Sequence, residues 1–358
     1  MRLRLAILVS VAFQLSLWGQ VGSSEAPVPS DPLELVTGSA QPVMDAAARA
    51  ALVNLIVRAH ALSNVRSSPY HMKSSFLSTT DGAWQLEDEW MGRGLYRWTA
   101  QGPSYSGVNL NANQMHYSSQ PGVAIPLRLA QVRGALFFMN NTIPGPRASL
   151  RTADANLDGT AITCVLMERG FMGTPVAGGR RWMEQEFCLD PKTGLIMTYS
   201  PVPGLYIRYD YSGAIHFHDR TLPATFTITE AGQPVIEAKI ESVTDPVPGD
   251  NALFQPNGLT EVGAGPPMMA PRYVRMGMGM RGQMQASGAV ALHGMMSAAG
   301  KLSDLEVLAS SDPNLNQPAL ARVANLQMWA NQVQAGATPE SCEVYFTMES
   351  QNFRTGVQ

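Results

Sequence analysis

The sequence predicts an α+β protein with a large curved antiparallel sheet, an incomplete barrel, that carries an N-terminal helix. A small two-layer ββαβ domain is expected to follow it. Three observations predict this fold: one helical period near the start, roughly a dozen short strand-like segments between residues 70 and 243, and a Pro/Gly-rich stretch before a shorter C-terminal pattern. The expected parts are residues 1–23, 33–255, 256–272 (linker) and 273–353.

The N-terminus has the layout of a secretory signal peptide. Basic residues Arg2 and Arg4 precede a mostly apolar stretch from Leu5 to Trp18, and small residues follow at Gly22–Ser24. We expect cleavage after Ser23 and a periplasmic or secreted protein. The alternative is an uncleaved N-terminus that holds the protein at the membrane.

Charge and hydropathy exclude two classes of function. The chain has 25 basic and 28 acidic residues, a formal net charge of -3, which is not the basic footprint of a nucleic-acid-binding protein. No apolar run reaches the length of about 18 residues that a membrane-spanning helix needs, so a polytopic membrane protein is excluded as well.

A helix is expected from Pro42 to Leu62, because Leu52, Leu55, Ile56 and Ala59 recur at the spacing of one helical face. A curved sheet with a helix on its concave face encloses an apolar space, which is typical of binding proteins more often than of enzymes.

The strands that follow are short, alternate in polarity or are rich in aromatic residues, and are separated by turns such as Asp190–Gly194. A helix-like or irregular insert interrupts them around Pro126–Asn140. The expected strands are Tyr70–Ser78, Trp84–Met91, Gly94–Ala100, Tyr105–Leu110, Gln114–Ser118, Ala148–Arg151, Ala161–Glu168, Arg181–Leu189, Gly194–Ser200, Leu205–Tyr211, Ile215–Phe217, Ala224–Glu230 and Gln233–Val243.

Three cysteines fit an exported protein. Cys164 and Cys188 lie on consecutive expected strands, so antiparallel pairing brings them within reach of a disulfide in an oxidising compartment. The alternative is a pair of buried free thiols. Cys342 is expected to be a buried strand thiol.

The C-terminal part predicts strands at Gly288–Met296 and Leu302–Ser310, a helix at Pro318–Trp329 and a last strand at Glu343–Glu349. This order and the residues Gly288–Val290, Gly300–Leu308 and Val344–Thr347 resemble the periplasmic C-terminal domain of TonB-type energy transducers. The chain departs from that family after Trp329, where Ala330-Asn331 stands in place of a basic or aromatic residue and Pro. The resemblance implies a degenerate interaction domain.

The first part resembles the LolA-type lipoprotein-carrier fold, an incomplete antiparallel barrel over a helical lid. The resemblance rests on Pro69–Lys73, Glu87–Trp90, Tyr96-Arg97 and Phe187–Ile196. It implies an apolar ligand, such as a lipid or a lipoprotein acyl chain.

Three polar or sulfur-rich patterns are weighed as chemistry. His216 and His218 could begin a metal site, but ordinary strand-face histidines are the expected reading, and clustered methionines such as Met276, Met278 and Met280 could bind Cu(I) or a partner. The pairs Glu87/Glu89 and Glu184/Glu186 have strand spacing and are expected on solvated faces balanced by arginines. No catalytic residue, metal site or cofactor is therefore expected.

The sequence thus predicts a non-enzymatic exported protein that binds an apolar ligand in its curved sheet and an envelope protein partner by adding a strand edge. The alternative is a TonB-type energy transducer retained by an uncleaved anchor. Val344, Tyr345 and Phe346 are the expected partner contacts. The candidate cavity lining, which could equally be plain core, is aromatic: Phe76, Trp84, Trp90, Trp98, Phe137 and Phe138.

Overall fold

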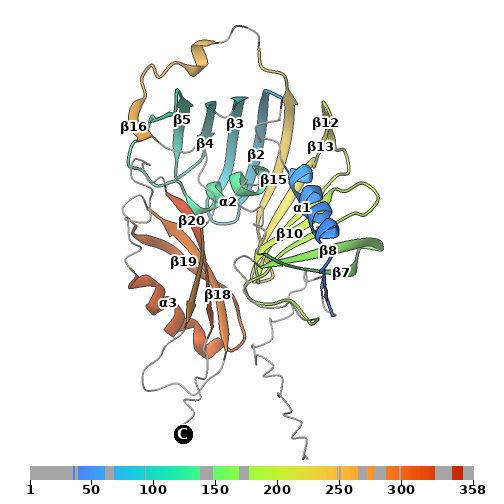
Figure 1. Cartoon of the computed structure of the whole chain (residues 1–358). Coiled ribbons are helices and arrows are strands. Elements are labelled where there is room, and N and C mark those ends of the chain that lie inside the picture. The colour runs from blue at the N-terminus through green and yellow to red at the C-terminus, as the bar shows by residue number, and fades with distance from the viewer. Residues whose placement is uncertain are drawn as a thin grey trace, which may run out of the picture.

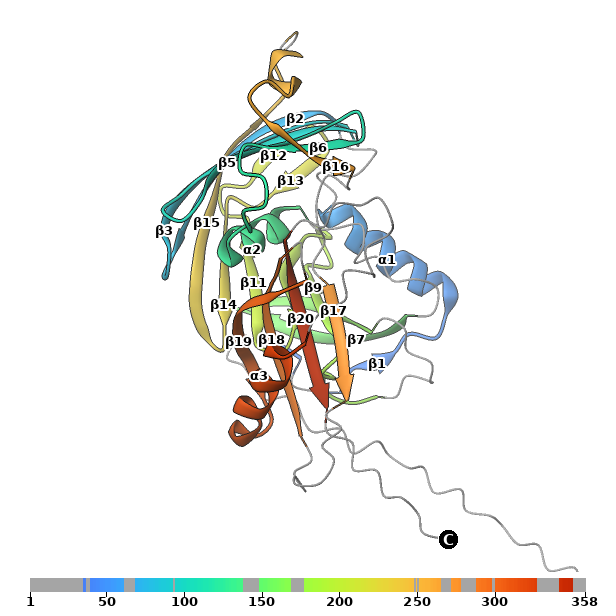
Figure 2. The same ribbon diagram turned by 90° about the vertical axis from the view of Figure 1, so that its left-hand side faces the viewer.

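A computed structural model describes residues 35–349 apart from 37–38, 61–67, 93, 138–147, 169–176, 248, 250, 265–271, 278–287, 298–299 and 327–340. In this part of the chain one large curved sheet holds a smaller sheet on its concave side (Figures 1 and 2). The expected signal peptide and Phe138 lie outside the described residues.

The large sheet has fourteen strands, and neighbouring strands run antiparallel. Its order is β1-β7-β8-β9-β10-β11-β14-β15-β2-β3-β4-β5-β6-β16, so the outermost strands β1 and β16 do not meet and the barrel is incomplete, as predicted. The strands from β1 to β8 are β1 (Gln41–Pro42), β2 (Tyr70–Ser78), β3 (Gly82–Gly92), β4 (Leu95–Gln101), β5 (Ser106–Ala112), β6 (Met115–Ser118), β7 (Ser149–Leu157) and β8 (Thr160–Glu168).

The remaining strands of this part follow the predicted spacing with two additions. They are β9 (Gln185–Leu189), β10 (Ile196–Val202), β11 (Leu205–Asp210), β12 (Ile215–Phe217), β13 (Arg220–Leu222), β14 (Thr225–Glu230), β15 (Gln233–Thr244) and β16 (Thr260–Ala264). The short β13 pairs with β12 outside the main sheet, and β16 pairs with β6. Because β16 lies within the stretch 256–272, part of the expected linker is an edge strand of the sheet.

Helix α1 (Ala46–His60) confirms the predicted N-terminal helix. The side chain of Asp45 accepts a hydrogen bond from the backbone N–H of Ala48 at 2.7 Å, which satisfies one of the free donors of the first turn. Ile56 is buried, and Leu52 and Leu55 pack against the main core. The apolar face that the spacing predicts is therefore the face that docks.

Helix α2 (Leu127–Leu136) occupies the region expected to be helix-like or irregular. It lies between β15 of the large sheet and β20 of the small one (Figure 2). Eight of its residues are buried, among them Arg128, Gln131 and Arg133. A helix buried on nearly all sides brings its polar side chains into the core, where they need partners.

The small sheet has the order β17-β20-β18-β19 and carries one α-helix. Its parts are β17 (Arg272–Gly277), β18 (Ala289–Met296), β19 (Leu302–Ser310), a 3-10 turn (Pro313–Leu315), α3 (Asn316–Ala324) and β20 (Cys342–Glu349). The predicted ββαβ order is present, and β17 adds an outer strand that runs parallel to β20.

The hydrophobic core of the large sheet includes side chains of the small sheet, which also has a separate cluster of buried residues against α3. Leu308 of β19 and Tyr345 of β20 belong to the same cluster of buried side chains as Trp90, Trp98 and Phe187 of the large sheet. The small sheet is therefore packed into the concave side of the large sheet, and we call the surface where it meets the large sheet and α2 the seam.

The predicted disulfide joins Cys164 and Cys188, which lie directly opposite each other on β8 and β9. The bond closes a loop with a sequence separation of 24 residues. We expect the double variant Cys164→Ala/Cys188→Ala to lose about 3 kcal/mol of unfolding free energy, because the unfolded chain regains the entropy that the loop removes.

Urea unfolding of the native and double-variant proteins, each with and without reductant, measures this loss. Reductant should weaken the native protein to the level of the variant and leave the variant unchanged. A native protein that keeps its stability in reductant would show that the bond contributes nothing to the fold.

Candidate functional site

A cluster of charged side chains lies buried at the seam. We call it the seam cluster; it joins α2 and the large sheet to the small sheet, and its members are Arg128, Gln131, Glu230, His293, Glu306 and Glu343. Arg128, Glu230, His293 and Glu343 are each almost fully buried, whereas the side chain of Glu306 is about half exposed. Six polar side chains from five elements therefore cross the interface.

The centre of the cluster is a set of short contacts to carboxylates. Arg128 Nη1 lies 2.6 Å from Glu230 Oε1, and Gln131 Nε2 donates a hydrogen bond to the same oxygen at 2.5 Å. On the small sheet, His293 Nδ1 lies 2.9 Å from Glu343 Oε1, and Tyr345 donates its hydroxyl proton to Glu343 Oε2 at 2.7 Å. Arg128 of α2 thus compensates Glu230 of the large sheet, and His293 compensates Glu343 within the small sheet.

The carboxylates set the charge of His293. Burial alone would lower the pKa of the imidazole, but the neighbouring carboxylates of Glu306, Glu343 and Glu230 raise it to about 9. In turn, His293 and Arg128 lower the pKa of Glu306 to about 2. At neutral pH both His293 and Glu306 therefore carry a charge within this network.

A second buried network holds α2 against the large sheet. Arg133 Nη1 donates to Asp88 Oδ1 at 2.9 Å, Tyr96 donates its hydroxyl proton to the same oxygen at 2.8 Å, and Arg133 Nη2 donates to the Tyr96 hydroxyl oxygen. The guanidinium carbon also lies 4.1 Å from the ring centroid of Trp98. Burial raises the pKa of Asp88, and the charge of Arg133 opposes that rise. Removing either partner would therefore leave an uncompensated charge in the core.

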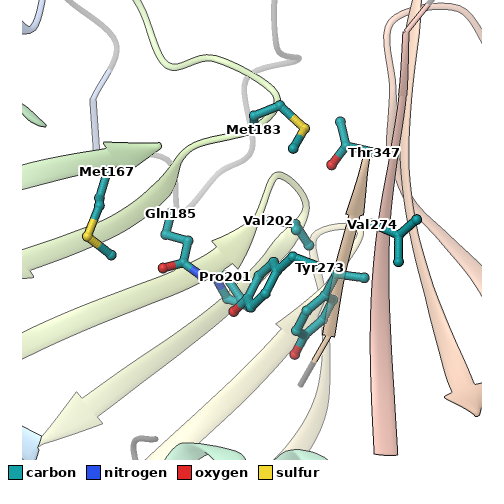
Figure 3. Close-up of a pocket in the computed structure, with 9 residues that line it drawn as sticks. Met167, Met183, Gln185, Pro201, Val202, Tyr273, Val274 and Thr347 are labelled. Atoms are coloured by element: carbon teal, nitrogen blue, oxygen red, sulfur yellow. The ribbon is translucent and has the colours of Figure 1, made fainter. Parts of the chain in front are cut away.

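An apolar pocket of about 40 Å³ opens at the seam (Figure 3). Tyr345, whose hydroxyl bonds to Glu343 of the seam cluster, is one of its lining residues. Residues of the large sheet and the segment leading into β9 form one wall, and residues of β17 and β20 form the other. The lining residues are Met167, Met183, Gln185, Pro201, Val202, Tyr273, Val274, Tyr345 and Thr347.

Close backbone contact keeps the seam shut beside this pocket. Gly204, in the turn between β10 and β11, has φ +85°, and a Cβ atom at this position would lie 2.1 Å from the carbonyl oxygen of Leu308. Across the seam, the hydroxyls of Tyr199 and Tyr273 lie 3.0 Å apart. The two sheets therefore touch through main-chain atoms as well as side chains.

The expectation of a solvated Glu184/Glu186 pair is wrong. Both side chains are almost fully buried, and Glu184 accepts from Arg151 Nη2 at 2.6 Å while Glu186 Oε2 lies 3.3 Å from Arg180 Nη1. Glu184 precedes β9, so the two residues do not share the face that strand spacing implied. Glu87 does lie on the partly exposed surface, with His71 Nε2 2.7 Å from its Oε1.

The aromatic residues expected to line a cavity lie in the main core. Phe76, Trp84, Trp90, Trp98 and Phe137 are buried together there, and none of these five lines the pocket at the seam. Phe76 and Trp84 stack with ring centroids 5.4 Å apart. Within the described residues α2 and the small sheet pack into the space that the curvature of the large sheet creates.

The expected partner contacts Val344, Tyr345 and Phe346 lie on β20, which pairs with β17 on one side and β18 on the other. An internal strand has no free edge, so a partner cannot add a strand at β20. Among the described strands of the small sheet, the outer ones are β17 and β19. Tyr345 instead contributes to the pocket wall and to the seam cluster.

The two histidines of the β12 region have separate partners. His218 Nε2 lies 2.8 Å from Asp245 Oδ1, and His216 Nδ1 lies 3.3 Å from the Thr221 hydroxyl. Of the clustered methionines, Met276 lies on β17, and the segment with Met278 and Met280 is outside the described ranges. No described helix has both the length and the hydropathy that crossing a bilayer requires.

Sequence reasoning missed the seam cluster. A weak signal was present, because His293 is a single ionisable residue in the otherwise apolar run Ala289–Met296, and Arg128, Gln131 and Arg133 are spaced among apolar residues of α2. What could not be read from the chain is that these segments face each other.

Comparisons with known proteins add little to this picture. No family model matches the chain, and no curated protein matches it. A solved structure of a LolA superfamily protein from Nitrosomonas europaea is similar at 9% sequence identity and a TM-score of 0.38, over 56% of this chain and 96% of that chain.

Proposed function

We propose that this chain is an exported, non-enzymatic protein that binds an apolar ligand, such as a lipid or acyl chain, between its curved sheet and its C-terminal sheet. The observation that supports this most directly is the apolar pocket at the seam. Its walls come from two sheets that are far apart in the sequence, and they include methionine side chains, which adapt readily to irregular apolar ligands.

The pocket is small in the described state. A volume of about 40 Å³ holds a few water-sized groups at most, so an acyl chain enters only when the sheets move apart. The seam is suited to that movement, because much of it consists of charged groups that water can solvate when it opens. A seam of apolar side chains alone would resist opening far more strongly.

Two further parts of the proposal rest on other observations. The disulfide between Cys164 and Cys188 supports an oxidising compartment, in line with the secretory layout of the N-terminus. Contact with an envelope partner by strand addition would use the outer strands β17 or β19. The carboxylates of Glu230 and Glu343 are paired with Arg128 and His293, an arrangement that favours binding over acid–base catalysis.

Filling the pocket tests the proposal. Met183 is half-buried at the pocket wall, so Met183→Trp is expected to occupy the space without unfolding the core. We expect the native protein to bind a fluorescent fatty acid and the variant to bind it at least about tenfold more weakly, since a ring replaces the space that the chain would enter. Fluorescence titration and native mass spectrometry of protein purified from the exported fraction measure this.

Met91→Trp is the matched control, because Met91 is exposed on β3 away from the seam. It should bind the probe as the native protein does. A native protein that carries no apolar molecule after purification and does not bind the probe would refute the proposed function.

A further inference from the structure

We propose that Glu230, His293 and Glu306 form a binding site for one divalent transition-metal ion of the zinc type, which would join the two sheets. Glu230 ends β14 of the large sheet, whereas His293 and Glu306 lie opposite each other on β18 and β19 of the small sheet. One ligand atom from each lies within 4.8 Å of the other two. The inference is independent of the apolar ligand.

The distances suit an ion better than a hydrogen bond. His293 Nε2 lies 3.5 Å from Glu230 Oε1 and 3.7 Å from Glu306 Oε2, and it has no hydrogen-bond partner although it is buried. Two ligands held at about 2.1 Å from a tetrahedral ion are about 3.4 Å apart. Nε2 therefore lies from each of the two carboxylates at close to the spacing that such an ion imposes.

The other side of the imidazole is already oriented for a metal ligand. Glu343 Oε1 lies 2.9 Å from His293 Nδ1, and an ionised carboxylate can only accept, so Nδ1 carries the proton and donates it. Tyr345 and Gln131 hold Glu343 in turn. A carboxylate behind a histidine in this way is the usual arrangement around protein-bound metals, because it fixes the ring and leaves Nε2 for the ion.

The charge of the site points to a dication. Glu230, Glu306 and Glu343 bring three negative charges, and Arg128 offsets one of them. Once the ion displaces the Nε2 proton, His293 is neutral, and the two negative charges that remain equal the charge of one divalent ion. Arg128 contacts Oε1 of Glu230, whereas the buried Oε2 has no hydrogen-bond partner and can turn toward the ion.

The donor set indicates which ion fits. One imidazole with carboxylates suits Zn²⁺ and its first-row neighbours, while Mg²⁺ and Ca²⁺ prefer sites made of oxygen ligands alone. On binding, the ion displaces any proton on His293 Nε2, and this proton leaves to solvent. The bond from Glu306 to the ion then replaces the 3.5 Å contact between Glu306 and Arg128. A bound ion would then hold β14 to β18 and β19.

Isothermal titration of the chelator-treated, full-length exported protein tests the site. We expect one equivalent of Zn²⁺ to bind, no binding of Mg²⁺, and at least tenfold weaker Zn²⁺ binding by Glu306→Gln. Because the side chain of Glu306 is about half exposed, this variant is expected to fold, and circular dichroism checks that it does.

Two control variants separate this site from others. Glu87→Gln alters the other partly exposed group with metal-ligand spacing, His71, Glu87 and Glu89, and Glu237→Gln makes the same change at an exposed position of β15. Both should bind Zn²⁺ as the native protein does. The proposal is overturned if the native protein binds no Zn²⁺, if Glu306→Gln binds it unchanged, or if Glu87→Gln loses it.

Discussion

Replacing Gly204 with alanine is expected to open the seam. The residue has φ +85°, which costs an alanine about 1–2 kcal/mol. Its Cβ would also lie 2.1 Å from the carbonyl oxygen and 2.4 Å from the carbonyl carbon of Leu308. These are main-chain atoms of β19, which cannot turn aside as a side chain can, so the small sheet must move away.

Gly159→Ala provides the matched comparison, because Gly159 has the same φ of +85° but no atom within 4 Å of the added Cβ. We expect Gly204→Ala to lose at least about 2 kcal/mol more unfolding free energy than Gly159→Ala, the amount that overpacking typically adds. Urea unfolding gives both values, and binding of a hydrophobic dye reports the exposed seam. Equal losses in the two variants would mean that the sheets do not meet at Gly204.

Removing the Arg133 guanidinium is expected to destabilise the protein strongly. Arg133→Met keeps most of the side-chain volume but leaves the carboxylate of Asp88, which is fully buried, without its cation. An uncompensated buried charge of this kind costs about 3–5 kcal/mol. The variant also loses the contact of the guanidinium with the Trp98 ring.

The double variant Asp88→Asn/Arg133→Met removes both charges and should regain much of that loss. Arg208→Met, which breaks an ion pair with Asp158 at the exposed surface, should lose about 1 kcal/mol or less. Urea unfolding of the four proteins measures these differences. If Arg133→Met were no less stable than Arg208→Met, α2 would not be held through this pair.

The curved sheet could be predicted because most of its strands have a recognisable local pattern in the sequence. In β2, the apolar residues Tyr70, Met72 and Phe76 lie at even spacing in the sequence, and all three are buried on one face. Helix α1 was predictable for the same reason, since Leu52, Leu55 and Ile56 face one way. Strand order also predicted that Cys164 and Cys188 lie within reach of each other, and the structure joins them.

Local sequence patterns do not show which segments pack against the concave side of the sheet. β16 and β17 lie in or at the end of a Pro/Gly-rich stretch that reads as a linker, and their pairing partners are remote in sequence: β6 for one and β20 for the other. The spacing of Glu184 and Glu186 suggests an exposed strand face, but both side chains are buried in ion pairs with Arg151 and Arg180. Tertiary contacts override strand spacing in both cases.

The candidate site was hidden for a related reason. Each member of the seam cluster has an ordinary local setting, and its meaning comes from a partner on another element, as with Gln131 of α2 and Glu343 of β20. The order of two strands, a helix and a last strand could be predicted for the C-terminal part, yet the free edge expected at Val344–Phe346 is covered by β17. The sequence predicted most of the elements, but not which of them face each other at the seam.

The most direct test of the account is the distance across the seam with and without an apolar ligand. Spin labels on Lys239→Cys in β15 and Lys301→Cys beside β19 occupy exposed positions on the two sheets, and Cys342 is buried. Double electron–electron resonance should show one distance for the free protein and an additional, longer distance once a fatty acid binds. A single unchanged distance in protein with bound fatty acid would contradict a ligand site between the sheets.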